Sequence, residues 1–120
     1  MSGYPDVLLH IDGQWRGGRA GATLAVHDPA TGEAIGRVAM AERDDLDDVL
    51  AAAARGFEAW RRVPAVERAR TMREAARLLR ERAEAVARLL TLENGKPLAE
   101  ALAEVRFGAE IIEWFAEEGK

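Results

Sequence analysis

The stretch Ala34–Ala53, AIGRVAMAERDDLDDVLAAA, decides the fold, because the spacing of its apolar residues changes within it. Before Asp44 the period is close to two, as in strands; after Asp44 apolar residues recur at every third or fourth position, as in an amphipathic helix. The expected apolar face of that helix consists of Leu46, Val49, Leu50, Ala53, Phe57 and Trp60. The sequence therefore predicts strands in residues 1–42 and helices in residues 43–120.

Two turns divide the first part into a pair of hairpins. Asp12-Gly13 stands between short apolar segments, and both residue types tolerate positive φ. A second turn, Asp28-Pro29-Ala30-Thr31-Gly32, lies between the expected strands 24–27 and 34–40. The glycines at 17, 18 and 21 are expected to connect the two hairpins.

Three long helices are expected to follow. The first begins near Asp44 and ends before Pro64; the second runs from about Ala65 to Leu92. The third starts near Pro97, because proline is favoured at the first helical position. The predicted fold class is α/β: two N-terminal β-hairpins and three helices in a single unit, residues 1–120.

The third helix is apolar on more than one side. Its main stripe consists of Leu98, Leu102, Val105, Ala109, Ile112 and Ala116. A second side carries Phe107, Ile111, Trp114 and Phe115. A helix this broad in apolar surface needs cover on more than one side, and the rest of the chain offers little to provide it.

Composition excludes several classes of protein. The 120 residues are 48% hydrophobic and 32% charged, as in a globular protein, and the net charge of −4 argues against a nucleic-acid binder. The absence of cysteine excludes disulfides, thiolate metal sites and a thiol nucleophile. Neither a signal peptide nor a membrane-spanning segment is recognisable, so a cytoplasmic location is expected.

No motif in the chain carries chemistry by its own spacing. Gly95-Lys96 is not a phosphate-binding P-loop, because Leu90 and Pro97 stand where that loop needs Gly and Ser or Thr. The acidic run DDLDD suits a first helical turn, where the helix dipole favours anions, and lacks the pattern of a calcium loop. His10 and His27 lie in predicted strands without a supporting motif. We therefore assign no catalytic and no cofactor-binding residue.

Five segments in order resemble the N-terminal region of NAD(P)-dependent aldehyde dehydrogenases. They are HIDGQW (10–15), HDPATGEAIGRVAMA (27–41), FEAWRRVPAVERARTMREAARLL (57–79), TLENGKPLAEALAEV (91–105) and EIIEWFAEEGK (110–120). The last two are most similar to the succinate-semialdehyde dehydrogenase branch. The resemblance implies that this chain is an N-terminal piece of the cofactor-binding domain of such an enzyme.

This chain alone cannot carry out the aldehyde oxidation that the family catalyses. Family members oxidise an aldehyde through a cysteine thiolate, with NAD or NADP as hydride acceptor. The nucleophile, the base and the cofactor loop match positions beyond Lys120, so the chain is expected to be inactive. The implied partners are the remainder of the enzyme chain, an aldehyde such as succinate semialdehyde, and further copies in a homo-oligomer, without nucleic acid or membrane.

The resemblance also suggests two sites within the chain. Some family members bind a monovalent cation through two backbone carbonyls and an acidic side chain, which match Val26, His27 and Glu93 here. Phe107 matches a position that lines the substrate tunnel, although a core aromatic is an equally good interpretation. The alternative to an enzyme fragment is a stand-alone, non-catalytic helical module whose third helix docks on a partner protein.

Overall fold

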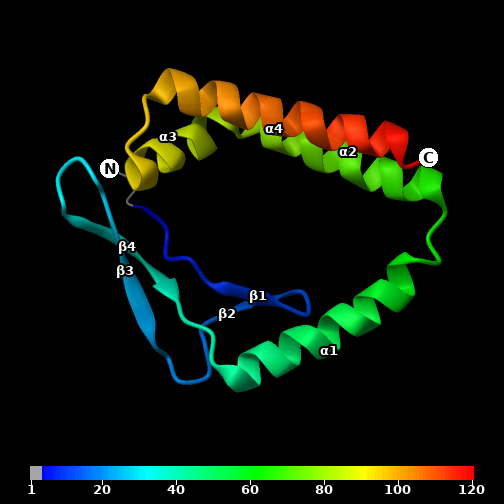
Figure 1. The fold of residues 1–120 in the computed structure, drawn as a ribbon, viewed down its shortest axis with the longest axis horizontal. Helices are drawn as coiled ribbons and strands as arrows, with labels where there is room; N and C mark the ends of the chain where they lie inside the picture. Colours follow the sequence, from blue (N-terminus) through cyan, green and yellow to red (C-terminus); the bar gives the residue numbers. More distant parts are fainter. Residues whose placement is uncertain (1–3) are drawn as a thin grey trace. The chain divides into compact units, whose positions relative to one another are not determined.

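The first predicted hairpin is present in the computed structural model, which describes residues 4–120 (Figure 1). Strand β1 (Leu9–Ile11) pairs antiparallel with β2 (Gln14–Arg16), and His10 lies opposite Trp15. The turn residues Asp12 and Gly13 have φ angles of 51° and 78°, so both are in the left-handed region. This conformation is the one expected for an Asp-Gly hairpin turn.

The second hairpin is also confirmed. Strand β3 (Thr23–His27) pairs antiparallel with β4 (Ala34–Ala39), with an irregularity in register between Val26 and His27. Gly32 takes the positive φ of 75° that closes the turn. The sequence did not indicate that Val7 would join β4 as a parallel bridge, in which the Val7 amide donates to the Arg37 carbonyl at 2.8 Å.

Four helices follow, so the prediction of three is wrong. They are α1 (Arg43–Trp60), α2 (Ala65–Glu81), α3 (Ala83–Asn94) and α4 (Leu98–Glu118). The predicted second helix is divided at Arg82, whose φ of −99° and ψ of 8° depart from helical values. The other predicted ends agree within a few residues, with Gly95 at φ 81° ending α3 and Pro97 preceding α4.

No local signal in the sequence marks the break at Arg82. No glycine or proline lies there, and the buried stripe continues across it through Ala76, Leu79 and Ala83. Both α2 and α3 pack on α4 (Figure 1). We infer that contact of both segments with one partner helix interrupts the backbone, which periodicity cannot reveal because the spacing of apolar residues is unchanged.

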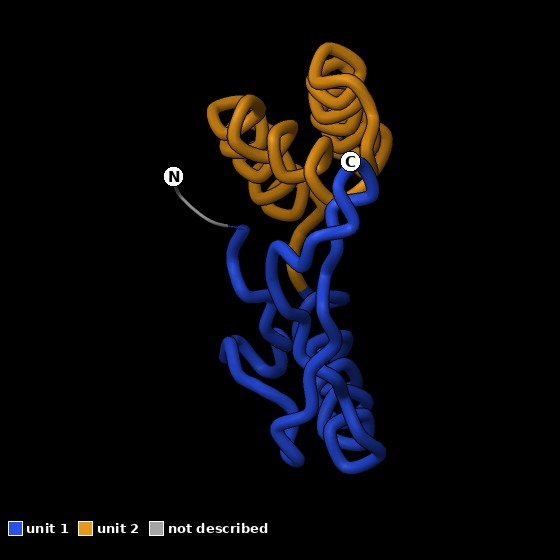
Figure 2. Tube along the Cα trace, turned by 90° about the vertical axis from the view of Figure 1, so that its left-hand side faces the viewer, with its two compact units in different colours: residues 1–62 blue, residues 63–120 orange. Residues whose placement is uncertain are grey.

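The chain divides into two compact units, shown in different colours in Figure 2. Unit 1 comprises the residues up to Arg62 and holds both hairpins and α1; unit 2, Val63–Lys120, holds α2, α3 and α4. The contacts thus group α1 with the hairpins. The predicted division at residue 42 separates strands from helices and follows secondary structure alone.

The hydrophobic core lies in unit 2 and is built from small residues. Ala83, Ala87, Ala101 and Val105 form its buried centre. Packed against them are Leu79, Val86, Leu90 and Leu102. In the described part of unit 1, by contrast, the only buried residues are Ile11, Ala39 and the charged Asp45. The stability of unit 1 therefore depends on polar contacts far more than the stability of unit 2 does.

The predicted apolar face of α1 is not covered. Leu46, Leu50 and Phe57 are 54%, 67% and 61% exposed, while the buried residue of the helix is Asp45. On α4, the main stripe is buried or half-buried apart from Leu98, whereas the second side is open. No helix in residues 4–120 is both long enough and apolar enough to cross a membrane.

Candidate functional site

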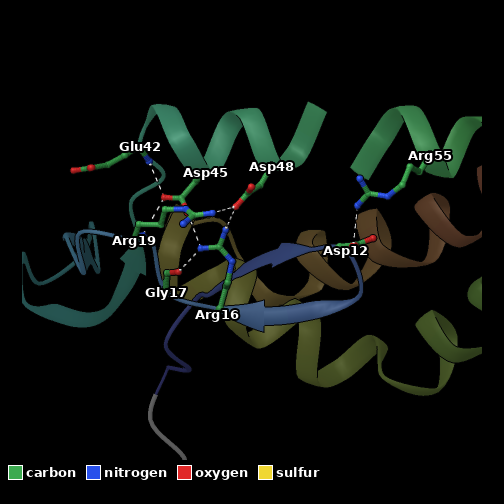
Figure 3. A network of polar contacts seen from close by, with 8 residues as sticks. All are labelled: Asp12, Arg16, Gly17, Arg19, Glu42, Asp45, Asp48 and Arg55. Carbon is green, nitrogen blue, oxygen red and sulfur yellow. Dashed lines mark hydrogen bonds and ion pairs between the residues drawn. The ribbon is translucent and has the colours of Figure 1, made fainter. Parts of the chain in front are cut away.

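The most developed polar arrangement in the chain surrounds Asp45 at the start of α1 (Figure 3). Arg16, from β2, donates from Nη1 to Asp45 Oδ1 at 2.6 Å and from Nη2 to Asp48 Oδ2 at 3.2 Å. Asp45 is completely buried, and Arg16 keeps 29% of its side chain exposed. The hairpin and the helix are therefore joined by a buried charge.

Backbone amides complete the surroundings of Asp45. The amides of Glu42 and Arg19 donate to Asp45 Oδ2 at 3.0 Å and 3.1 Å. The Glu42 contact belongs to a capping box, which satisfies amides that the first helical turn leaves unpaired. Arg19 also donates from Nη2 to Asp48 Oδ2 at 2.6 Å. The two aspartates thus fix β2, the loop after it and the first turn of α1.

The arrangement holds Asp45 as an anion. The Glu42 amide, the Arg16 guanidinium and the Arg19 amide outweigh the effect of burial and lower the pKa of Asp45 from 3.8 to about 2. A carboxylate this acidic, with both oxygens engaged by donors, is unsuited to acid–base catalysis near neutral pH. We assign it a structural role.

Sequence reasoning missed this cluster. The acidic run was explained by the helix dipole alone, and Arg16 lies 29 positions before Asp45. The spacing of Glu42 and Asp45, an acid three positions after the N-cap, was a visible sign of a capping box. Nothing in the spacing indicated that the same carboxylate would bind an arginine from the first hairpin.

A cavity of about 220 Å³ lies between the first hairpin and α1. It is lined by Ile11, Asp12, Gln14, Arg16, Asp48, Ala51 and Arg55. Arg55 Nη2 donates to Asp12 Oδ2 at 2.9 Å, and Arg16 binds Asp48. Figure 3 marks both contacts with dashed lines. Because each arginine of the lining is paired with an aspartate of the same lining, the cavity offers no unneutralised charge to a ligand.

The predicted cation ligands lie in different units. Val26 and His27 end β3, where the register is irregular, and His27 Nδ1 lies 3.2 Å from the Gly32 carbonyl oxygen. Glu93 lies in the last turn of α3 and is exposed. Val26 and His27 belong to unit 1 and Glu93 to unit 2, and their joint site stays a prediction.

Phe107 is 61% exposed on the open side of α4. Within the described chain it is therefore not a core aromatic. Whether it lines a substrate passage depends on what covers this side of the helix, and that role also stays a prediction.

Glu113 and Glu117 of α4 are engaged in ion pairs with α2. Arg80 binds Glu113 through both guanidinium nitrogens at 2.6 Å and 2.7 Å, and Arg73 Nη1 donates to Glu117 at 2.7 Å. The Arg80 contact lowers the pKa of Glu113. These two acids therefore join the charged outer side of α4 to α2.

The described residues contain no group of three or more histidine or acidic side chains able to hold a metal ion. His10 packs against Trp15 across the first hairpin, with ring centroids 4.5 Å apart. Since the chain also has no cysteine, it offers no thiol nucleophile for covalent catalysis.

Comparisons with known proteins agree with the sequence resemblance. Residues 15–120 match the aldehyde dehydrogenase family. The chain is 45% identical over 116 residues to 4-(hydroxymethyl)benzenesulfonate dehydrogenase of Comamonas testosteroni, covering 97% of this chain and 24% of that protein. It is 44% identical over 110 residues to the NADP(+) succinate-semialdehyde dehydrogenase of Escherichia coli, covering 92% and 23%.

Solved structures show the same similarity. The succinate-semialdehyde dehydrogenase of Burkholderia pseudomallei superposes with a TM-score of 0.92 at 40% identity, covering 95% of this chain and 24% of that one. The chain spans about a quarter of the length of the relatives it matches. The family match over 15–120 and the shared fold together establish that this chain belongs to the aldehyde dehydrogenase family.

Proposed function

We propose that this chain is the N-terminal portion of an NAD(P)+-dependent aldehyde dehydrogenase that oxidises a short aldehyde with a distal acid group, such as succinate semialdehyde. The observation that carries the proposal is the match of residues 15–120 to the family, together with relatives about four times as long as this chain. The role of the chain within that enzyme is architectural.

The names of several relatives support an acidic substrate. Proteins 41–45% identical to this chain are named for aspartate, succinate, malonate and glutarate semialdehydes. Each of these aldehydes carries a carboxylate remote from the reacting carbon. Succinate semialdehyde lies within this class, and the acid group is the feature that its members share.

The remainder of the enzyme must supply the reacting groups. This chain has no cysteine to attack an aldehyde. Its positive-φ glycines lie in turns and at the end of α3, so they do not form the glycine-rich turn opening a helix that binds a dinucleotide. We therefore place NAD or NADP on the rest of the protein and expect the isolated chain to be inactive.

The full enzyme is proposed to be a cytoplasmic homo-oligomer, in which the rest of the polypeptide covers the open faces of α1 and α4. Phe107 then borders the substrate passage. A monovalent cation is proposed to bind the carbonyls of Val26 and His27 and the carboxylate of Glu93, since hard cations prefer oxygen ligands. Loss of a sodium- or potassium-dependent rise in thermal stability in the Glu93→Gln variant of the full protein would support that site.

A chimera tests the architectural role. Residues 1–120 would replace the matching segment of the Escherichia coli succinate-semialdehyde dehydrogenase, to which they are 44% identical. We expect NADP+-dependent oxidation of succinate semialdehyde by the chimera and none by the isolated chain. A folded chimera without activity, or turnover by the pure isolated chain, would contradict the proposal.

The alternative is a stand-alone protein-interaction module, which the open apolar side of α4 favours. The reading frame that follows codon 120 separates the two. A continuing frame that encodes a cysteine-bearing catalytic domain would exclude the module, and a frame that ends there in a stably produced protein would favour it.

A further inference from the structure

Another cavity, of about 490 Å³, lies where α2 meets α3, and its volume is more than twice that of the cavity beside α1. Its walls come from the end of α2, the start of α3 and one residue of α4, which pack together in unit 2 (Figure 1). The charged residues of the lining are Arg80, Glu81, Arg82, Glu84, Arg88 and Arg106. Arginine is therefore the main charged residue of this cavity.

Two of these charged side chains are already engaged within unit 2. Arg80 binds Glu113 through both terminal guanidinium nitrogens, and Glu81 accepts a hydrogen bond from Arg77. The remaining charges of the lining are three arginines and one glutamate, which leave a net charge of +2. This positive charge is a local feature, because the whole chain carries a net charge of −4.

The three remaining arginines have no partner within residues 4–120. The side chains of Arg82, Arg88 and Arg106 form neither an ion pair nor a hydrogen bond in this part of the chain. Glu84 stands four positions before Arg88, the spacing of a helical ion pair, but does not bind it. The same is true of Glu110, four positions after Arg106. Like charges around one cavity repel one another, so the entry of an anion is favoured.

Arg106 reaches the cavity from the packed side of α4. It lies four positions after Leu102, which packs against the core, and three positions before Ala109, which is 0% exposed. Residues at these spacings share one side of a helix. The cavity is therefore built by unit 2 itself and does not belong to the open side of α4.

We propose that Arg82, Arg88 and Arg106 bind a phosphate group, either as orthophosphate or as the end of a phosphomonoester. A doubly charged phosphate matches the net charge of +2 that the lining leaves. Its three acceptor oxygens suffice for one contact with each guanidinium, whereas a carboxylate has only two oxygens. The planar guanidinium also fits phosphate oxygens in pairs. The inference rests on unit 2 alone and does not depend on the enzymatic assignment.

The guanidinium carbon signals of the full 120-residue chain, labelled with carbon-13 in arginine, test the proposal by NMR. Orthophosphate, methyl phosphate or succinate is added at about pH 8, where a phosphate monoester is doubly charged, and chloride keeps the ionic strength constant. We expect saturable shifts of the Arg82, Arg88 and Arg106 signals with both phosphates. Succinate, a dianion whose charges lie apart, should bind at least about tenfold more weakly.

The comparison of the two phosphates identifies the source of the group. Tighter binding of methyl phosphate would indicate a phosphomonoester, and tighter binding of orthophosphate would indicate the free ion. Shifts that do not saturate, or an equal affinity for succinate, would overturn the proposal.

Variants with opposite expected effects separate binding from a structural role. Arg106→Gln should weaken orthophosphate binding about tenfold, because it removes a charged donor. Glu84→Gln should strengthen binding, because it removes the unpaired carboxylate of the lining. Arg43→Gln is the matched control: it removes the same charge at an exposed arginine of α1 and should change the Kd by less than about twofold.

Equal effects of Arg106→Gln and Arg43→Gln, or weaker binding in Glu84→Gln, would contradict the site. If a variant fails to fold, the difference between orthophosphate and succinate on the unmodified chain still decides.

Discussion

Arg16 Nη1 lies 2.6 Å from Oδ1 of the completely buried Asp45, and this ion pair joins the first hairpin to the first helix. Few apolar residues of unit 1 are buried, so the pair lies where a hydrophobic core would otherwise hold the elements together. Removing one partner would leave the other charge poorly compensated, which destabilises more than the pair itself stabilises.

The Asp45→Asn variant should loosen unit 1 and leave unit 2 intact. Asparagine is close in size but loses the negative charge that faces Arg16 and one of the oxygens that accept hydrogen bonds. We expect faster amide hydrogen exchange in the loop 17–21 and at the start of α1, with unchanged exchange in α2 and α4. Hydrogen exchange followed by mass spectrometry measures both units in one sample. Equal protection in the variant and the unmodified chain would contradict the structural role.

Unit 1 should also lose stability in acid. The pKa of Asp45 is lowered to about 2 from an unfolded value near 3.8. The contribution of this ionised carboxylate to the free energy of unfolding is therefore complete above about pH 4. As the pH falls from about 4 toward 2, the unfolded chain binds the proton first, and the contribution is lost. Circular dichroism against pH should show a drop in that window that is smaller in Asp45→Asn, because asparagine does not titrate.

A methyl group at Gly18 should disrupt the loop over Asp45. A Cβ built there would lie 2.0 Å from the Met40 carbonyl oxygen, which is backbone and cannot move aside cheaply. We expect Gly18→Ala to cost about 1–3 kcal/mol or more in the free energy of unfolding of unit 1. Gly17→Ala is the matched control, since nothing lies within 4 Å of its Cβ. Similar unfolding midpoints for the two variants in urea would contradict this packing.

The helix pair of unit 2 should be sensitive to the size of Ala76. This residue is 0% exposed in the unit where α2 packs on α4, so a larger side chain forces the helices apart. Ala76→Leu should lower the free energy of unfolding of unit 2 by about 1–3 kcal/mol. Ala75→Leu places the same side chain on the exposed side of α2 and should change stability by less than about 0.5 kcal/mol. Urea titration followed by hydrogen exchange in α4 distinguishes the two.

Local signals in the sequence predicted the elements well. Asp12-Gly13 and Gly32 predicted the two hairpin turns, and Gly95 and Pro97 predicted the junction of α3 and α4. These predictions are confirmed because the backbone conformation at each position is one that the residue type itself favours. The break at Arg82 could not be predicted, because no glycine or proline marks it and the spacing of the apolar residues is unchanged across it.

The candidate site was predicted less completely, for a related reason. Periodicity showed that α1 is amphipathic but not which side would face its own unit, and the structure buries Asp45 while Leu50 remains 67% exposed. A periodic pattern indicates that an apolar face will be covered. It does not identify which residues cover that face. The open faces of α1 and α4 are consistent with a chain that spans about a quarter of its relatives' length.

The same substitution should have opposite effects at two glycines of unit 2. Gly95 ends α3 at φ 81°, where a Cβ is strained, so Gly95→Ala should cost about 1–2 kcal/mol. Gly108 lies within α4, and nothing lies within 4 Å of the Cβ it would gain, so Gly108→Ala should stabilise by about 0.5–1 kcal/mol through the lower entropy of the unfolded chain. Urea unfolding of unit 2 measures both. Destabilisation by Gly108→Ala would contradict the open space at this position.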